Sequence, residues 1–169
     1  VEVRSDGSTN MEHYWDEAVG YIFGLTDPAL FANASAWTDQ DANGVNDPVY
    51  DDEFLLKYLA KDIYPTQQVA VYNALIKGRE AIKAPTCFVE LTKQKAAIKA
   101  ALTHVILDKA HYYIDWCVNN ASPGDAGWHH YISEGYGFLY ALQYTDLMSR
   151  AEVMTHLNTL DGVDANGNV

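Results

Sequence analysis

The residues with the clearest chemical potential are a histidine and a glutamate that recur together, four positions apart. His13 precedes Glu17, and His130 precedes Glu134 near the other end of the chain. Residues four apart lie on one face of a helix, so each copy presents an imidazole beside a carboxylate. Helix bundles build internal metal sites from such side chains. The pairs therefore predict a metal site between two repeat helices, unless each pair is only a polar contact between packed helices.

Each pair belongs to a longer segment that occurs twice. Residues 13–23 and 130–140 both read His-x-x-x-Glu-small-x-Gly-aromatic-x-aromatic. The glycine of this pattern, Gly20 in one copy and Gly137 in the other, is expected to let another helix approach closely. Imidazole and carboxylate together suit borderline and harder transition ions. The predicted ligands of the transition ion are therefore His13, Glu17, His130 and Glu134.

A loop between the first helices has the spacing of a calcium-binding loop. It reads Asp39-x-Asp41-x-Asn43-Gly44-Val45-x-Asp47, which matches the first nine positions of an EF-hand loop. Tyr50 stands at position twelve, where a bidentate glutamate belongs, so Asp52 or a neighbouring acid would complete a longer loop. The alternative is an Asx-turn-rich linker without an ion. The predicted calcium ligands are Asp39, Asp41, Asn43, Val45, Asp47 and Asp52.

A polar stripe is expected on the long helix in the middle of the chain. His104, Asp108, His111 and Asp115 share one helical face. Facing inward, the first three would be second-tier candidates to complete the metal site. Facing outward, the stripe would be an ordinary solvated face, which is favoured because the adjacent stripe is apolar. That apolar stripe contains Ile98, Ala101, Leu102, Val105, Tyr112 and Trp116.

Composition excludes several classes of partner. The formal net charge of −12 over 169 residues argues against nucleic acid and anionic membrane surfaces, which require clustered Lys and Arg. No run of 18 apolar residues exists, so a membrane-spanning helix is not expected. Cys87 and Cys117 are separated largely by the long helix, about 39 Å at 1.5 Å per residue, so no disulfide is expected between them.

Hydrophobic periodicity is helical throughout and predicts an all-α bundle of about six helices in one domain. Ser149 and Glu152 form a capping box at the start of the last helix. Residues 1–9 and 161–169 are expected to be loop and tail. The expected helices are 10–25, 52–63, 67–83, 91–119, 126–144 and 149–160. The core candidates of the third helix are Val69, Tyr72, Leu75, Ile76 and Ile82.

Motifs for common enzymatic chemistry are absent from the sequence. It contains no Gly-rich phosphate loop, no Gly-x-Ser-x-Gly elbow and no His-Glu-x-x-His zinc-protease helix. Cys-x-x-Cys-His, the attachment motif of c-type haem, is also absent. A hydrolase or a non-covalent haem binder stays a weaker alternative.

Two motifs resemble a known family. His-x-Trp-Asp-Glu-Ala-x-Gly-Tyr at residues 13–21 and Ser-Glu-Gly-x-Gly-Phe at 133–138 resemble signatures of an uncharacterised family of exported bacterial proteins. That family is similar to the imelysin-like iron-regulated proteins. The resemblance implies a pseudo-symmetric pair of helical bundles, a periplasmic, outer-surface or extracellular location, and a link to iron or another metal. It implies binding more than turnover. It also implies that this chain corresponds to the C-terminal half of longer relatives.

These observations lead to two functional hypotheses. The first is an exported, non-catalytic protein that binds a transition metal, iron by analogy. The second is an extracellular structural or interaction module that calcium stabilises. In the second case the module assembles with itself as a homo-oligomer, or with a partner such as the missing N-terminal half.

Overall fold

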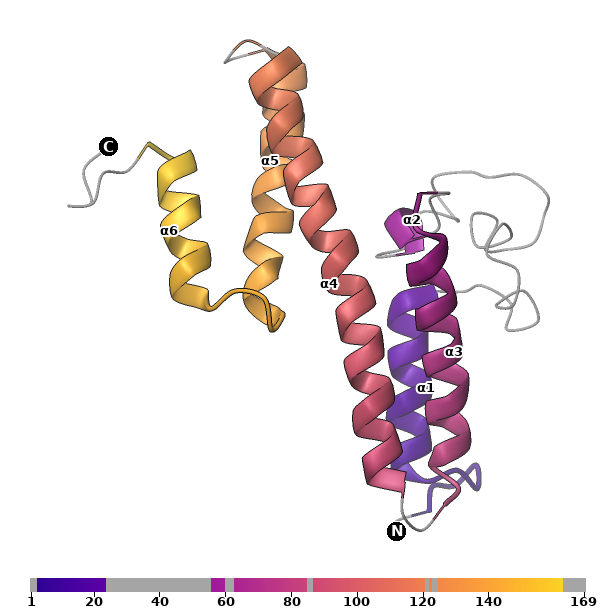
Figure 1. Ribbon diagram of the computed structural model, residues 1–169. Coiled ribbons are helices and arrows are strands. Elements are labelled where there is room, and N and C mark those ends of the chain that lie inside the picture. Colours follow the sequence, from indigo (N-terminus) through magenta and orange to yellow (C-terminus); the bar gives the residue numbers. More distant parts are fainter. Residues whose placement is uncertain are drawn as a thin grey trace. The chain divides into compact units, whose positions relative to one another are not determined.

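A computed structural model describes residues 3–23, 56–59, 63–84, 87–120, 122 and 125–162. The described residues form helices and no strand, which confirms the all-α prediction (Figure 1). The six calcium-ligand candidates lie outside the described residues. The helices are α1 (Asn10–Phe23), α2 (Leu56–Leu59), α3 (Pro65–Ala81), α4 (Cys87–Asn120), α5 (Ala126–Ala141), the 3-10 helix η3 (Leu142–Tyr144) and α6 (Arg150–Leu160).

The chain divides into two compact units, Val1–Leu102 and Thr103–Val169. The long helix α4 contributes its first half to unit 1 and its second half to unit 2. The two cysteines lie near opposite ends of α4, and both are buried and free, as expected. No helix in the described part of the chain is long and apolar enough to cross a membrane.

Unit 1 is built around the contact between α1 and α3. α3 begins at Pro65, two residues before the expected start, because proline is well suited to the first turn of a helix. Its buried face consists of Gln68, Val71, Ala74, Leu75 and Gly78. Val69 and Ile76, which periodicity placed in the core, are exposed, and so is Ile63, which lies outside α2.

The physical reason is that polar and small residues occupy the packed side of α3. The side-chain amide of Gln68 donates a hydrogen bond from Nε2 to the Leu59 carbonyl at 2.8 Å, which satisfies a buried polar group. Gly78 leaves the space that the Trp15 ring fills. Neither residue contributes to an apolar stripe, so the stripe placed Leu75 correctly in the core but wrongly assigned Val69 and Ile76 to the buried face.

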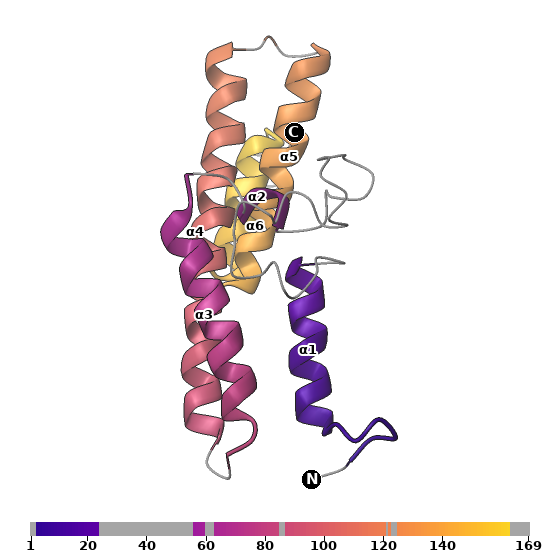
Figure 2. The ribbon, with the colours of Figure 1, turned by 90° about the vertical axis from the view of Figure 1, so that its right-hand side faces the viewer.

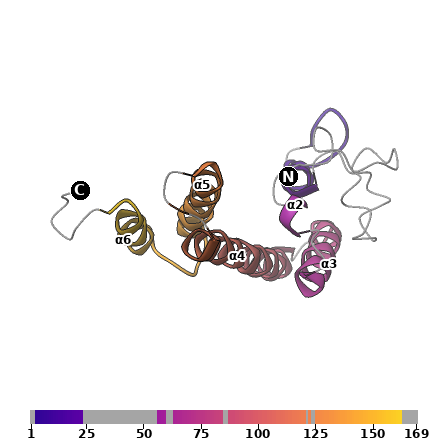
Figure 3. The ribbon, with the colours of Figure 1, turned by 90° about the horizontal axis from the view of Figure 1, so that it is seen from above.

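Unit 2 begins with a helical hairpin. The chain turns back after α4 into α5 (Figure 2), and α6 follows η3. Figure 3 shows α5 and α6 almost end-on. The buried core comprises Ala110, Leu139, Leu142, Val153 and Leu157.

Two capping boxes define helix starts, one in each unit. Ser149 and Glu152 exchange hydrogen bonds at the start of α6, as predicted. Thr9 and Glu12 do the same before α1: the Glu12 amide donates to Thr9 Oγ1 at 3.2 Å, and the Thr9 amide donates to Glu12 Oε2 at 2.9 Å. Such caps satisfy backbone N–H groups that have no partner within the helix.

The motif glycines do not have the predicted role. Among the described residues, no atom would contact a Cβ at Gly20 or at Gly137. Close helix approach occurs instead at Gly135, where a Cβ would lie 2.9 Å from Ile114 Cγ1. The prediction was wrong because it inferred the packed face from the sequence pattern, whereas the neighbouring helix determines it.

Candidate functional site

The first histidine–glutamate pair is brought together on the surface of α1. His13 Nε2 and Glu17 Oε2 are 4.0 Å apart, and the two side chains are 38 % and 48 % exposed. The pair is a local consequence of the helix, because residues four apart share a face. Both groups are accessible to a solute.

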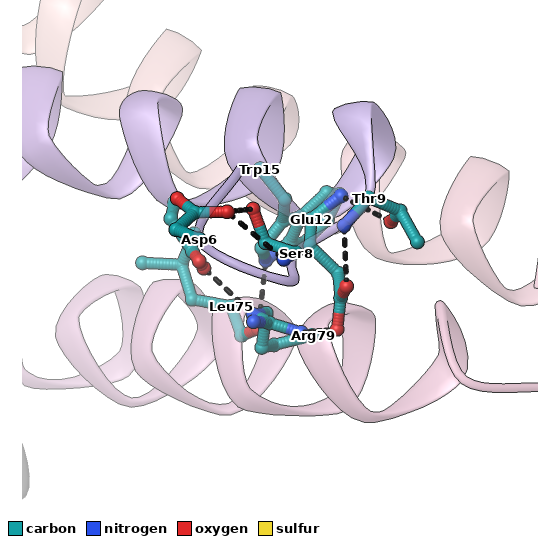
Figure 4. Close-up of polar contacts among 8 residues, drawn as sticks. Asp6, Ser8, Thr9, Glu12, Trp15, Leu75 and Arg79 are labelled. Carbon is teal, nitrogen blue, oxygen red and sulfur yellow. Dashed lines mark hydrogen bonds and ion pairs between the residues drawn. The ribbon is translucent and has the colours of Figure 1, made fainter. Parts of the chain in front are cut away.

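The neighbouring face of α1 is held on α3 by an ionic clamp (Figure 4). Arg79 of α3 donates from Nη1 to Glu12 Oε1 and from Nε to Asp16 Oδ1, each at 2.7 Å. The hydrogen bond from the Thr9 amide, followed by the one from Arg79, lowers the pKa of the Glu12 carboxyl to about 2. The same carboxylates raise the pKa of Arg79. Glu12 and Arg79 therefore stay charged at neutral pH.

Trp15 makes the second contact between α1 and α3. Its indole Nε1–H donates a hydrogen bond to the Leu75 carbonyl at 3.0 Å (Figure 4). The ring lies directly over Gly78, where an added Cβ would come within 1.9 Å of Trp15 Cζ2. The clamp and the tryptophan together anchor the helix that carries His13 and Glu17.

The second pair lies on α5, in unit 2. His130 is exposed and Glu134 is half-buried. The ring of Tyr131, next to His130, stacks on Trp116 of α4, with centroids 3.7 Å apart and an interplanar angle of 11°. Phe138 likewise stacks on Tyr113 of α4 at 5.6 Å. Burial, with a smaller effect from Tyr112, raises the pKa of Tyr131.

The polar stripe of α4 faces outward. His104, Asp108, His111 and Asp115 are all exposed, whereas Ala101 and Val105 on the adjacent stripe are buried. Among the described residues, no group of three or more His, Cys, Asp or Glu is arranged to hold a metal ion. The ligand pairs predicted from the repeat therefore remain predictions.

A pocket of about 270 Å³ lies in unit 2, among α4, α5, η3 and α6. Its walls are mainly apolar, and three polar side chains also line it: His111, His156 and Thr159. Hydrophobic periodicity did not predict this pocket, because residues from separate helices form it. The apolar lining includes Leu107, Ile114, Leu139, Leu142, Met148 and Leu160.

Sequence reasoning also missed the clamp between α1 and α3. Arg79 lies far along the chain from its two carboxylate partners, so no local pattern connects them. The one available signal was Gly78, a glycine in the interior of a predicted helix, because such a glycine costs helix stability and often marks close packing.

Comparison with known proteins gives one match. Residues 2–167 match a family described as a domain of unknown function, DUF4856. No curated protein and no solved structure matches the chain. The match covers almost the whole chain and gives no ligand or activity.

Proposed function

The chain belongs to the DUF4856 family, which is defined by a domain of unknown function, and we propose that it is an exported, non-catalytic metal-binding protein. The observation that carries this proposal is the separation of His13 Nε2 and Glu17 Oε2, 4.0 Å on an accessible helix surface. Bonds from transition ions such as zinc to imidazole nitrogen and carboxylate oxygen are about 2.0–2.2 Å long. A tetrahedral ion with such bonds holds its ligand atoms about 3.4 Å apart, so a small rotation of either exposed side chain would let one ion contact both.

Anchoring of α1 supports the proposal. Arg79 and Trp15 hold the helix through contacts that do not involve His13 or Glu17. A ligand pair on an anchored helix loses less conformational freedom when it binds an ion than a pair on a free helix would. The net charge of −12 also favours cations over anions.

The second repeat provides another pair of the same residue types, His130 and Glu134, and we propose them as ligands too. Iron is the first metal to test, because the motifs at 13–21 and 133–138 resemble those of exported relatives of the imelysin-like proteins. The pseudo-symmetric architecture and the export of the chain are parts of the same proposal.

The experiment is elemental analysis of the protein as isolated, before any chelator is added. We expect about one equivalent of iron, zinc or manganese, the ions that imidazole and carboxylate ligands suit. His13→Ala and Glu17→Gln should each reduce the retained metal while the apo-protein melts at the wild-type temperature. His129→Ala and Glu80→Gln, which change exposed residues of the same types, should retain it.

Two results would overturn this assignment. One is a wild-type protein that holds no transition metal and takes none up on titration. The other is that the His13 and Glu17 variants retain as much metal as the His129 and Glu80 controls. If those variants unfold instead, the pair is a packing contact, as in the alternative hypothesis.

Calcium is a second candidate, supported by the spacing from Asp39 to Asp47. Its role would be to order the 39–52 loop of an extracellular module that assembles with itself or with a partner. Saturating calcium stabilises the state that binds it, by about 2.7 kcal/mol at a hundredfold excess over Kd. Added calcium should therefore raise the Tm of chelated protein, and Asp39→Ala with Asp41→Ala should abolish the gain. An unchanged Tm in the wild type would reject the site.

A further inference from the structure

The pocket of unit 2 has the size and lining of a small-molecule site. Its volume of about 270 Å³ exceeds the roughly 150 Å³ of an engineered apolar cavity that binds benzene. Leu139 and Leu142, which belong to the buried core, form part of its wall. A two-ring aromatic molecule or a short aliphatic chain therefore suits the apolar part.

The polar side chains of the pocket favour one kind of head group. The Thr159 hydroxyl donates its hydrogen to the Thr155 carbonyl at 3.0 Å, so towards a ligand it acts as an acceptor. The imidazoles of His111 and His156 each offer a donor or an acceptor nitrogen. A ligand hydroxyl, which both donates and accepts, matches these three groups.

Charge argues against an anionic head group. The Glu152 carboxylate lies one turn before His156 on α6, so a negative charge stands near that histidine. The chain as a whole carries a net charge of −12. A carboxylate ligand would enter an acidic environment, whereas a neutral ligand would meet no such repulsion.

We propose that this pocket binds a small neutral molecule of the phenol or alcohol class, with its apolar body against the leucines and its hydroxyl near His111, His156 and Thr159. The proposal does not depend on metal binding. Its polar residues, His111, His156 and Thr159, lie outside the repeated segment.

The experiment is a fluorescence titration of the full chain with 1-naphthol. We expect saturable one-to-one binding, and weaker binding of both naphthalene, which lacks the hydroxyl, and 1-naphthoate, which is charged. Thr159→Val should weaken binding about three- to tenfold, the usual effect of losing one hydrogen bond. Leu160→Trp, which fills the pocket, should weaken it more than tenfold.

The matched control is Thr155→Val. Thr155 lies one turn away on α6 and donates to the Ala151 carbonyl at 3.0 Å, as Thr159 does to Thr155, but it does not line the pocket. The Thr155→Val variant should bind 1-naphthol as tightly as the wild type does. Thr159 is exposed, so its substitution by valine should leave the fold intact even if Leu160→Trp does not fold.

Three outcomes would overturn the proposal. The first is no saturable binding by the wild type. The second is equal binding by the Thr155 and Thr159 variants, or tighter binding of 1-naphthoate than of 1-naphthol. The third is self-association that excludes 1-naphthol as protein concentration rises, which would assign this face to a second copy of the chain.

Discussion

The two copies of the repeated segment pack through different faces. In α5 the residues Tyr131, Gly135 and Phe138 lie against α4. Their counterparts in α1 are Tyr14, Ala18 and Tyr21, and all three are exposed, the two tyrosines by 64 % and 63 %.

α1 packs instead through neighbouring positions. Trp15 contacts α3 through a hydrogen bond and ring packing, and Glu12 and Asp16 bind Arg79. At the position of Trp15, α5 has Ile132. The motif therefore specifies a helix that can pack through either of two faces, and the adjacent helix determines which face is buried.

The largest expected effect is at the position where the copies differ most in size. Trp15→Ala should reduce the free energy of unfolding by about 3 kcal/mol, because it removes a packed aromatic side chain and its hydrogen bond to Leu75. Ile132→Ala, at the equivalent position of α5, should cost less because isoleucine is the smaller side chain and has no hydrogen-bonding group to lose. Urea denaturation followed by circular dichroism measures both. Equal losses would mean that the copies pack alike.

The exposed and stacked tyrosines give the next contrast. Tyr131→Ala should cost about 2 kcal/mol, because it removes a ring that stacks on Trp116. Tyr14→Ala should change stability by less than about 0.5 kcal/mol, as is usual for exposed positions. Thermal denaturation of the two variants in parallel tests this. A costly Tyr14→Ala would show that the outer face of α1 is covered.

The glycines test close approach without changing any polar group. Gly135→Ala should cost about 1–2 kcal/mol, because its Cβ would overlap the side chain of Ile114. Gly137→Ala should stabilise the protein by about 0.5–1 kcal/mol, because the space is open and alanine favours the helix. The difference in Tm between the two variants is the measurement. If both substitutions stabilise, α5 does not approach α4 closely at Gly135.

The smallest expected effect is a pH dependence of stability, which arises from Glu12 in the clamp between α1 and α3. The Glu12 pKa of about 2 lies below the ordinary 4.5, so its contribution to stability is complete above about pH 4.5 and is lost as pH falls through 2. The wild type should therefore be more stable than Glu12→Gln at pH 7, and the difference in Tm should shrink towards pH 2. A pH-independent difference would mean that the clamp does not act through charge.

Much of the helical content could be predicted from local sequence. The capping box at Ser149 and the helix that carries each His–Glu pair follow from contacts within a few residues. The absence of a disulfide followed from helix length alone. Of the candidate site, the first pair could be predicted because a helix places residues four apart on one face.

Tertiary structure alone decided how each helix is rotated. Val69 and Ile76 are exposed on α3 while Gln68 and Gly78 are buried, and Gly135 rather than Gly137 meets α4. It also decided the clamp at Arg79 and the pocket of unit 2, which join residues far apart in sequence. The physical reason is that a helix forms from hydrogen bonds between near neighbours, whereas its buried face depends on the shape and charge of the helix packed against it.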